Sequence, residues 1–290
     1  VGNQTESLIY IERKRKLARQ CGVEINHVQL PSHCPEETLL DLVDRFNVDP
    51  TVHGIMIQLP LDSLDSIDVS RSLHAIVAEK DVEGLGFVNT ALVSRENILC
   101  PACEGHRVHI PCTAAACLAL VHHVAFPLKG SHCVVIGRGR LVGAPTADLL
   151  VGPGEATVTQ CHRHSCNLAE KVACADLVVA AAGCPELVQG DWIKPGALVL
   201  DCGYNVVCDP RNPNKLRSVG DVQFDRAKLR AGWITPVPGG VGPVSLAMLF
   251  RNTVNSARWT AGLESFLCNC ANSIPLHESV YTVKRHCPSS

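Results

Sequence analysis

The segment Cys133-Val-Val-Ile-Gly-Arg-Gly-Arg-Leu-Val-Gly143 carries the strongest fold signal in the chain. Four apolar residues, typical of a buried strand, run into a glycine-rich turn, after which a helical stretch begins. A strand, a glycine turn and a helix N-terminus form the phosphate-binding unit of a Rossmann fold, because the glycines let the backbone approach a pyrophosphate. The spacing G-x-G-x-x-x-G is not the commonest form. We expect Gly137, Arg138, Gly139 and Gly143 to contact a dinucleotide.

The end of the next predicted strand indicates which dinucleotide is bound. Residues 156–159 lead into Cys161-His-Arg-His164. This is about 20 residues beyond the glycines, where an NAD enzyme carries an acid for the ribose 2′-hydroxyl. No acid is present there, and Arg163 together with Arg138 suits a 2′-phosphate. NADP is therefore favoured over NAD, and the alternative is that these basic residues form a solvated strand end.

Strand-like and helical segments alternate on both sides of this segment. Strands are predicted at residues 25–30, 52–58, 133–136, 156–159, 176–180 and 197–201. Helices are predicted at residues 6–21, 36–46, 113–123 and 244–261, with Thr113 as a cap and Gly262 as a stop. Such alternation predicts an α/β protein with parallel sheets and crossover helices.

The length of 290 residues favours two domains. The first α/β domain is expected to comprise residues 1–112 and to be completed by the helix at residues 244–261. Residues 113–243 form the expected Rossmann-like domain. Residues 262–290 have no clear periodicity and are a tail of unknown role.

Composition excludes several classes of partner. The net charge of -2 offers no basic face for nucleic acid, and no apolar run is long enough to cross a membrane. The 16 cysteines are scattered through apolar segments rather than arranged as a disulfide framework, so we expect a reducing compartment, the cytoplasm. Because the chain begins at Val1 without a methionine, we expect a preceding segment, and a mitochondrial location stays open.

Polar residues in the first half mark a candidate ligand site. Tyr10 and Lys14 are four residues apart on a predicted helix and share a face. Gln58 ends an apolar strand, at the edge where parallel sheets bind ligands. Glu83 follows Asp81 on a short loop. Each alone is also explained as a surface contact, a strand cap or a turn, and their combination favours a site.

The segment Thr235-Pro-Val-Pro-Gly-Gly-Val-Gly-Pro243 holds three prolines and three glycines in nine residues. Such a segment is predicted to be neither helix nor central strand. It is stiffer and more apolar than a linker, so we expect a rigid loop that lines the ligand site, with one X–Pro bond a candidate for the cis form.

These residues together resemble the methylenetetrahydrofolate dehydrogenase/cyclohydrolase family, most of all the corresponding part of the eukaryotic trifunctional C1-tetrahydrofolate synthase. The resemblance runs from Val1 to about Ala257. It rests on the motifs Ser7-x-x-Tyr10-x-x-x-Lys14, Val52-His-Gly54, Gln58-Leu-Pro-Leu61, Lys80-Asp-Val82, Pro111-Cys-Thr113, Val142-Gly-Ala-Pro145, Asp201-Cys-Gly203, Gly220-Asp-Val222 and the proline-glycine segment.

The resemblance implies a folate-binding α/β domain, a Rossmann-like NADP-binding domain and a cleft between them. Tyr10 would stack on the aminobenzoate of the folate, and Lys14, tuned by Gln58, would be the acid/base group of the cyclohydrolase. The implied substrate contacts also include Glu83, Pro238, Gly239 and Gly240, and the implied cofactor contacts include Thr113 and Gly242. The implied reaction turns 5,10-methylenetetrahydrofolate into the methenyl and then the 10-formyl form in one-carbon metabolism, and the implied assembly is a homodimer.

The chain departs from the family pattern at several positions. Glu83 replaces an aspartate, which moves the carboxylate by about 1 Å, and misplacement on that scale can cost about a hundredfold in rate. Ala114 and Ala116 replace a proline and a glycine, and Gly139 and Arg163 replace serines. The family's first helix and strand are also missing ahead of Val1. These departures keep open the alternative of a catalytically impaired folate- or NADP-binding relative.

Residues 97–109 do not align with the family and contain what looks like an insertion. Within it Cys100, Cys103, His106 and His109 are each separated from the next by two residues. Four such side chains can bind zinc, although the spacing is cramped for the usual two-knuckle arrangement. The alternatives are an unstructured surface loop and a sequence artefact such as a misjoined exon, and they are favoured over zinc.

Overall fold

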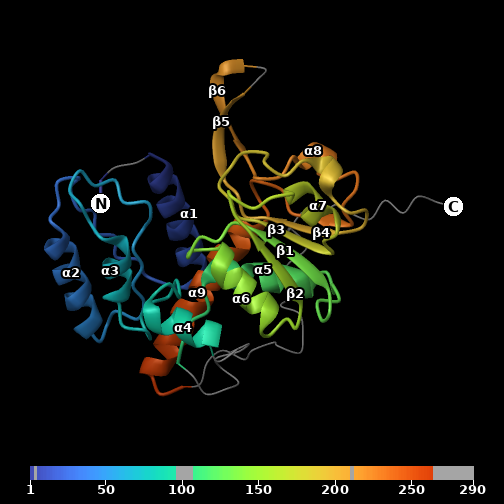
Figure 1. The fold of residues 1–290 in the computed structure, drawn as a ribbon. Helices are drawn as coiled ribbons and strands as arrows, with labels where there is room; N and C mark the ends of the chain where they lie inside the picture. The colour runs from blue at the N-terminus through green and yellow to red at the C-terminus, as the bar shows by residue number, and fades with distance from the viewer. Residues whose placement is uncertain (3–4, 96–106, 210–211, 264–290) are drawn as a thin grey trace. The chain divides into compact units, whose positions relative to one another are not determined.

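The computed structural model describes residues 1–2, 5–95, 107–209 and 212–263, without the side chains of residues 5–10, 95 and 212–214 (Figure 1). The chain divides into two compact units. Of the described residues, the first unit holds 1–2, 5–92, 107–110 and 246–263, and the second holds 93–95, 111–209 and 212–245. None of the helices described is long and apolar enough to cross a membrane.

The second unit is built on a five-stranded sheet with the order β2-β1-β3-β4-β7, in which every neighbouring pair is parallel. Its strands are β1 (His132–Ile136), β2 (Thr157–Cys161), β3 (Leu177–Ala180), β4 (Leu198–Asp201) and β7 (Trp233–Ile234). The first four were predicted from apolar runs, and the structure confirms them to within two residues at each end. The inner strands β1, β3 and β4 are almost wholly apolar because a parallel sheet is buried on both faces, whereas the edge strand β2 is largely polar and partly exposed.

Helices cover both faces of this sheet, as Figure 1 shows. These elements are α5 (Cys112–His123), α6 (Gly143–Val151), α7 (Leu168–Ala173), η1 (Gly190–Trp192) and α8 (Phe224–Ala227). Val134, Val178 and Val199 face the side of the sheet where Leu168 of α7 and Phe224 of α8 pack. Within each strand, the residues next to these valines point to the opposite face of the sheet, because side chains alternate along a strand.

The order of the strands locates the expected ligand crevice. The chain passes from β1 to β2 on one side and then to β3 on the other side of β1, so the winding reverses between β1 and β3. Ligands of doubly wound sheets bind outside the carboxyl ends of the strands at such a reversal. Gly137 directly follows β1, and Ala181 directly follows β3.

The first unit contains helices and extended segments. Its helices are α1 (Thr5–Cys21), α2 (Glu36–Val48), α3 (Val69–His74), most of α4 (Phe87–Arg95) and most of α9 (Val241–Thr260). The strands predicted at residues 25–30 and 52–58 are wrong: neither segment forms a ladder, and a strand needs a hydrogen-bonded neighbour. Within 52–58, a single parallel bridge joins Ile55 to Asp81.

Extended residues of the first unit still bury an apolar face. Ile55 and Ile57 are 6% and 7% exposed and pack with Leu39 and Val43 of α2 and with Leu73 of α3. The apolar periodicity that predicted a strand therefore located the core correctly, although it misjudged the hydrogen bonding.

An antiparallel hairpin of β5 (Asn205–Asp209) and β6 (Asn212–Val219) belongs to the second unit and forms a separate two-stranded sheet. The sequence reasoning missed it, because its strands lack a regular apolar alternation.

The helix α9 ends as the sequence predicted. Gly262 follows it with a φ of 70°, as expected for the residue that stops a helix.

Candidate active site

Lys14 of α1 contacts two side chains of the extended segment 52–58. Its Nζ donates to Gln58 Oε1 at 2.8 Å and to Met56 Sδ at 3.3 Å. Gln58 Nε2 donates to the carbonyl oxygen of Leu59 at 2.8 Å, so the amide oxygen is the atom that faces the lysine. The sequence singled out Lys14 and Gln58, and the structure brings them together across 44 residues. Tyr10 lies on the same helix, but its side chain is outside the described residues.

The buried carboxylate of Asp81 fixes the conformation of the loop that carries Glu83. Asp81 is 1% exposed and accepts hydrogen bonds from the backbone N–H of Gly84 and Gly86 and from Asn89 Nδ2, at 3.1, 2.7 and 2.8 Å. A buried carboxylate with this many donors is a structural anchor rather than a free acid. Asp81 therefore fixes the backbone from which Glu83 projects.

Glu83 itself is half-buried and lies in the field of Lys14. Burial raises the pKa of Glu83 to about 7; the charge of Lys14 opposes this shift, and that of Asp81 adds to it. Near neutral pH the carboxyl group is thus divided between its protonated and ionised forms. An acid of this kind beside an amine is the type of pair that catalytic and binding sites use.

Lys80, which precedes this loop, has a structural task. Its Nζ donates to the backbone oxygens of Phe46, Asn47 and Asp49 at 3.0, 2.8 and 2.7 Å. These carbonyls belong to the end of α2, where helices lack internal partners for them. Lys80 therefore joins the loop to α2.

In the second unit, the turn after β1 has the backbone geometry of a phosphate-binding loop. Gly137 has a φ of 112°, and a Cβ there would collide with the Ala181 carbonyl group. Gly143 opens α6, and a Cβ there would collide with the Gly137 carbonyl group. A Cβ at Gly139 would meet open space. Two of the three glycines are thus required for close packing of the turn that leads into the N-terminus of α6.

Basic side chains gather where β2 ends. Arg163 Nε donates to His164 Nε2 at 3.3 Å, and the His164 backbone N–H donates to His162 Nδ1 at 3.2 Å. Desolvation and then the charges of Arg138, His164 and Arg163 lower the pKa of His162. Arg138 of the glycine turn and Arg163 at the strand end therefore form one cationic region. His162 and His164, which sequence reasoning had not singled out, accept hydrogen bonds beside it.

Two buried aspartates organise the loops at the carboxyl edge of the sheet. Asp221 accepts hydrogen bonds from three consecutive backbone N–H groups after β3, those of residues 182–184, at 2.6 to 2.9 Å. Asp201, at the end of β4, accepts from the N–H groups of Gly203, Asp221 and Val222, each at 2.9 Å. Burial raises the pKa of Asp201 to about 6 despite these bonds. Both aspartates lie in motifs typical of the family, but only the structure reveals their task.

The proline-glycine segment is partly loop and partly helix. Residues 235–240 form a loop with a cis Val237–Pro238 bond, and Gly239 has a φ of 110°. The expectation of a loop is wrong for residues 241–243, which form the first turn of α9. Proline is tolerated in a first turn because its missing N–H has no helical partner there. Gly242 lies in this turn, where a Cβ would meet open space.

Thr113 does not cap α5. Pro111 occupies the cap position without a side-chain hydrogen bond, and Thr113 lies inside the helix. Its Oγ1 lies 3.0 Å from Ser245 Oγ, so it joins the first turns of α5 and α9. The predicted cap is therefore wrong, because the helix begins at Cys112, one residue earlier than the apolar pattern indicated.

Of the four candidate zinc ligands, only His109 lies within the described residues. It is 1% exposed, its Nε2 lies 2.8 Å from Ser256 Oγ, and its ring stacks on Trp259 with centroids 4.7 Å apart. Burial lowers the pKa of His109 to about 4, so the ring is neutral. Cys100, Cys103 and His106 are outside the described residues, and zinc binding stays a prediction.

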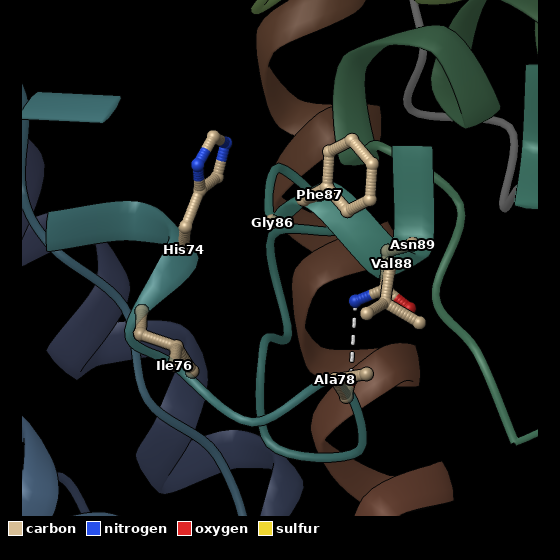
Figure 2. Close-up of a pocket in the computed structure, with 7 residues that line it drawn as sticks. All are labelled: His74, Ile76, Ala78, Gly86, Phe87, Val88 and Asn89. Carbon is tan, nitrogen blue, oxygen red and sulfur yellow. Dashed lines mark hydrogen bonds between the residues drawn. The ribbon is translucent and has the colours of Figure 1, made fainter. Parts of the chain in front are cut away.

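A separate pocket of about 350 Å³ lies between the end of α3 and the start of α4 (Figure 2). Its lining comprises His74, Ile76, Ala78, Gly86, Phe87, Val88 and Asn89. The rings of His74 and Phe87 meet edge to face with centroids 6.1 Å apart. None of the candidate site residues lines this pocket, so we do not count it as part of the candidate active site.

A doubly wound parallel sheet with a glycine turn at its switch point is typical of a dinucleotide-binding Rossmann-like domain, and here the same chain carries a second α/β unit in which a lysine contacts an amide. The tetrahydrofolate dehydrogenase/cyclohydrolase catalytic domain family matches residues 1–83, and the NAD(P)-binding domain of the same family matches residues 111–261. The chain belongs to the tetrahydrofolate dehydrogenase/cyclohydrolase family.

Individual relatives agree with this assignment. Human cytoplasmic C-1-tetrahydrofolate synthase is 45% identical over 89% of this chain, and the chain spans 27% of the length of that protein. The bifunctional protein FolD of Sinorhizobium fredii is 41% identical, over 89% of this chain and 81% of the relative. The crystal structure of Trypanosoma brucei methylenetetrahydrofolate dehydrogenase-cyclohydrolase, complexed with NADP and an inhibitor, is 40% identical with a TM-score of 0.81; the match covers 90% of this chain and 85% of that one.

Proposed function

We propose that this chain oxidises 5,10-methylenetetrahydrofolate to 5,10-methenyltetrahydrofolate with NADP and hydrolyses the product to 10-formyltetrahydrofolate. The observation that carries the proposal is the contact between Lys14 and Gln58, within the part of the chain that matches the family's catalytic domain. Lysine suits acid–base work when an oriented partner holds it in a partly desolvated site. The match covers most of the length of a bifunctional FolD protein and of a solved structure that is named for both activities.

Lys14 would act in the hydrolytic step. Water that attacks the methenyl carbon must lose a proton, and the ring nitrogen N5 must gain one when its bond to that carbon breaks. The Lys14 amine would take the first proton, and the resulting ammonium would supply the second. The hydroxyl group that the water leaves on the carbon would release its remaining proton to solvent as the formyl C=O forms, so that the methenyl cation and water give the neutral formyl product and one proton. Gln58 would keep the amine aimed at the reacting carbon, because its own amide is fixed by the Leu59 carbonyl group. Tyr10 would stack on the aminobenzoate, and Pro238, Gly239 and Gly240 would line the folate site.

The second unit would hold NADP. Gly137 and Gly143 shape a turn that a Cβ would fill, and the residues present therefore fit a pyrophosphate at the N-terminus of α6. Arg138 and Arg163 would clasp the 2′-phosphate, while Gly139, Thr113 and Gly242 would lie along the rest of the cofactor. Bound there, NADP would supply the hydride acceptor, and the protein's part is to orient it and exclude water. The family model itself names NAD(P), so the choice of NADP rests on the two arginines.

Turnover by the purified chain tests this function. With 5,10-methylenetetrahydrofolate and NADP we expect absorbance from NADPH, followed by conversion of the methenyl product to 10-formyltetrahydrofolate faster than in buffer. If NADP binds but neither product forms, the chain is instead a catalytically impaired binding relative. In that case the turnover of a Glu83→Asp variant shows whether the longer side chain of Glu83 causes the loss of activity.

Glu83 predicts a pH-dependent affinity for folate. If the carboxylate accepts hydrogen bonds from the pterin edge, only its ionised form binds well, and that form prevails above a pKa of about 7. The KM for the folate in the dehydrogenase reaction should therefore rise by up to about tenfold as the pH falls from about 8 to about 6. Glu83→Gln should flatten this dependence, whereas Glu79→Gln, at an exposed carboxylate nearby, should leave it unchanged. A flat profile in the unaltered chain would remove Glu83 from the folate site.

Assembly and location are proposed from relatives alone. We propose a homodimer, as the family resemblance implies, and sedimentation of the purified chain would test it. We propose a cytoplasmic location because the human relative is a cytoplasmic protein. The eleven cysteines among the described residues are all free, which agrees with a reducing compartment.

A further inference from the structure

Met56 lies on the same face of its segment as Gln58. In an extended chain, side chains two residues apart point to the same side. Ile55 and Ile57 point into the core, where they are 6% and 7% exposed. Met56 and Gln58 consequently face the opposite side, and both contact Lys14 there.

The backbone around Met56 is held from a neighbouring segment. The N–H of Ile55 donates to the carbonyl oxygen of Lys80 at 2.7 Å, and the bridge between Ile55 and Asp81 continues this contact. Lys80 is itself bonded to the end of α2. Met56 therefore projects from a fixed position between two core residues rather than from an adaptable loop.

The two contacts aim the lysine in complementary ways. Gln58 Oε1, at 2.8 Å, is a strong acceptor, and Met56 Sδ, at 3.3 Å, is a weak one. An ammonium group has three N–H donors, so a single acceptor leaves it free to rotate, and a second acceptor restricts that rotation. A thioether does this without stabilising the charged form as strongly as an oxygen would, so the amine can still release its proton. Glu83 is the carboxyl group whose charge acts on the same lysine.

We propose that Met56 is a second positioning residue for Lys14 in the hydrolytic step. This inference rests on the proposed function, because it assigns Met56 a role only through Lys14. The thioether would hold the lysine in its reactive direction without binding the ammonium form as tightly as an oxygen acceptor would.

Two substitutions separate positioning from packing. Met56→Leu keeps the apolar volume and removes the acceptor, and Met56→Gln keeps an acceptor and changes the packing. For a lost hydrogen bond, we expect Met56→Leu to lower the kcat of hydrolysis about three- to tenfold, with the KM for folate and the NADPH-forming rate within about twofold. Met56→Gln should hydrolyse faster than Met56→Leu, and its pH profile should move to higher pH because an amide oxygen favours the ammonium form. If Met56 only fills space, this order reverses and the profile stays in place.

Control variants distinguish a failure of the role proposed for Met56 from a failure of the proposed function. Met248 is the other methionine of the chain, is 3% exposed in α9, and gives a matched Met248→Leu variant that should leave both activities within about twofold. Thermal unfolding and NADP binding show whether each variant is folded. If Lys14→Met retains hydrolysis, the proposed function fails. If Lys14→Met loses hydrolysis while Met56→Leu keeps its full rate, only the role of Met56 is overturned.

Discussion

Lys14→Met is expected to lower the hydrolysis of 5,10-methenyltetrahydrofolate by at least about a hundredfold, because general acid–base catalysis contributes about 10²- to 10⁴-fold. Methionine keeps an unbranched side chain in this place but has no ionisable group. Gln58 and Met56 would lose the group that they orient. NADP binding, which we propose for the second unit, should change by less than about twofold. The measurement is the loss of methenyl absorbance, corrected for hydrolysis in buffer.

Lys16 offers a matched control for this prediction. It lies on the same helix but is exposed, so Lys16→Met should leave hydrolysis within about twofold. A Lys14→Met protein that stays folded and hydrolyses within tenfold of the unaltered chain would contradict the assignment. The site would then need a different acid–base group.

Replacing both Arg138 and Arg163 by serine should reduce the kcat/KM for NADP by about a hundredfold, with little change for NAD. Charge-assisted hydrogen bonds to phosphate are among the stronger contacts, and about tenfold for each exposed arginine is a conservative expectation. Only NADP carries the 2′-phosphate, so the effect should appear in the ratio of the two cofactors. Steady-state rates with each cofactor at fixed folate measure it.

A lysine at the amino ends of the strands, away from the two arginines, provides the control. Lys129 precedes β1 and pairs with Glu155, just ahead of β2, so it lies near the amino ends of these strands. Lys129→Gln should leave the cofactor ratio unchanged. An equal loss for NADP and NAD in the double arginine variant would show that the arginines support the fold or bind the shared part of the cofactor. An unchanged ratio would place the 2′-phosphate elsewhere.

The parts of the fold that could be predicted are those with local signals. The run from Cys133 to Gly143 encodes strand, turn and helix within eleven residues, and the structure reproduces each of them. The long apolar face of α9 was also found, although its start was placed three residues late because Pro243 was taken as a helix breaker. Extended segments near Ile25 and Val52 show the limit of such signals, since a strand depends on a partner that sequence periodicity does not reveal.

The parts of the site that could not be predicted depend on distant partners. Lys14 and Gln58 were chosen by residue type and resemblance, whereas Met56 has no chemical signature and is recognised only by its distance to the lysine. Asp221 was visible in the sequence, but its bonds to residues 182–184 join segments about 40 residues apart. Likewise, Lys80 reads as a charged residue beside two acids, and only its three carbonyl partners reveal a helix cap.

The distance from Lys14 Nζ to the one-carbon-bearing nitrogens of a bound folate tests most directly whether this lysine does the chemistry. It can be measured in a crystal of this chain with NADP and a folate analogue. We predict that Nζ lies within hydrogen-bond reach of the reacting group, at about 2.7–3.5 Å or through one water. In the same crystal the 2′-phosphate should lie against Arg138 and Arg163. A folate bound far from Lys14, with the lysine turned to solvent, would contradict the proposed function.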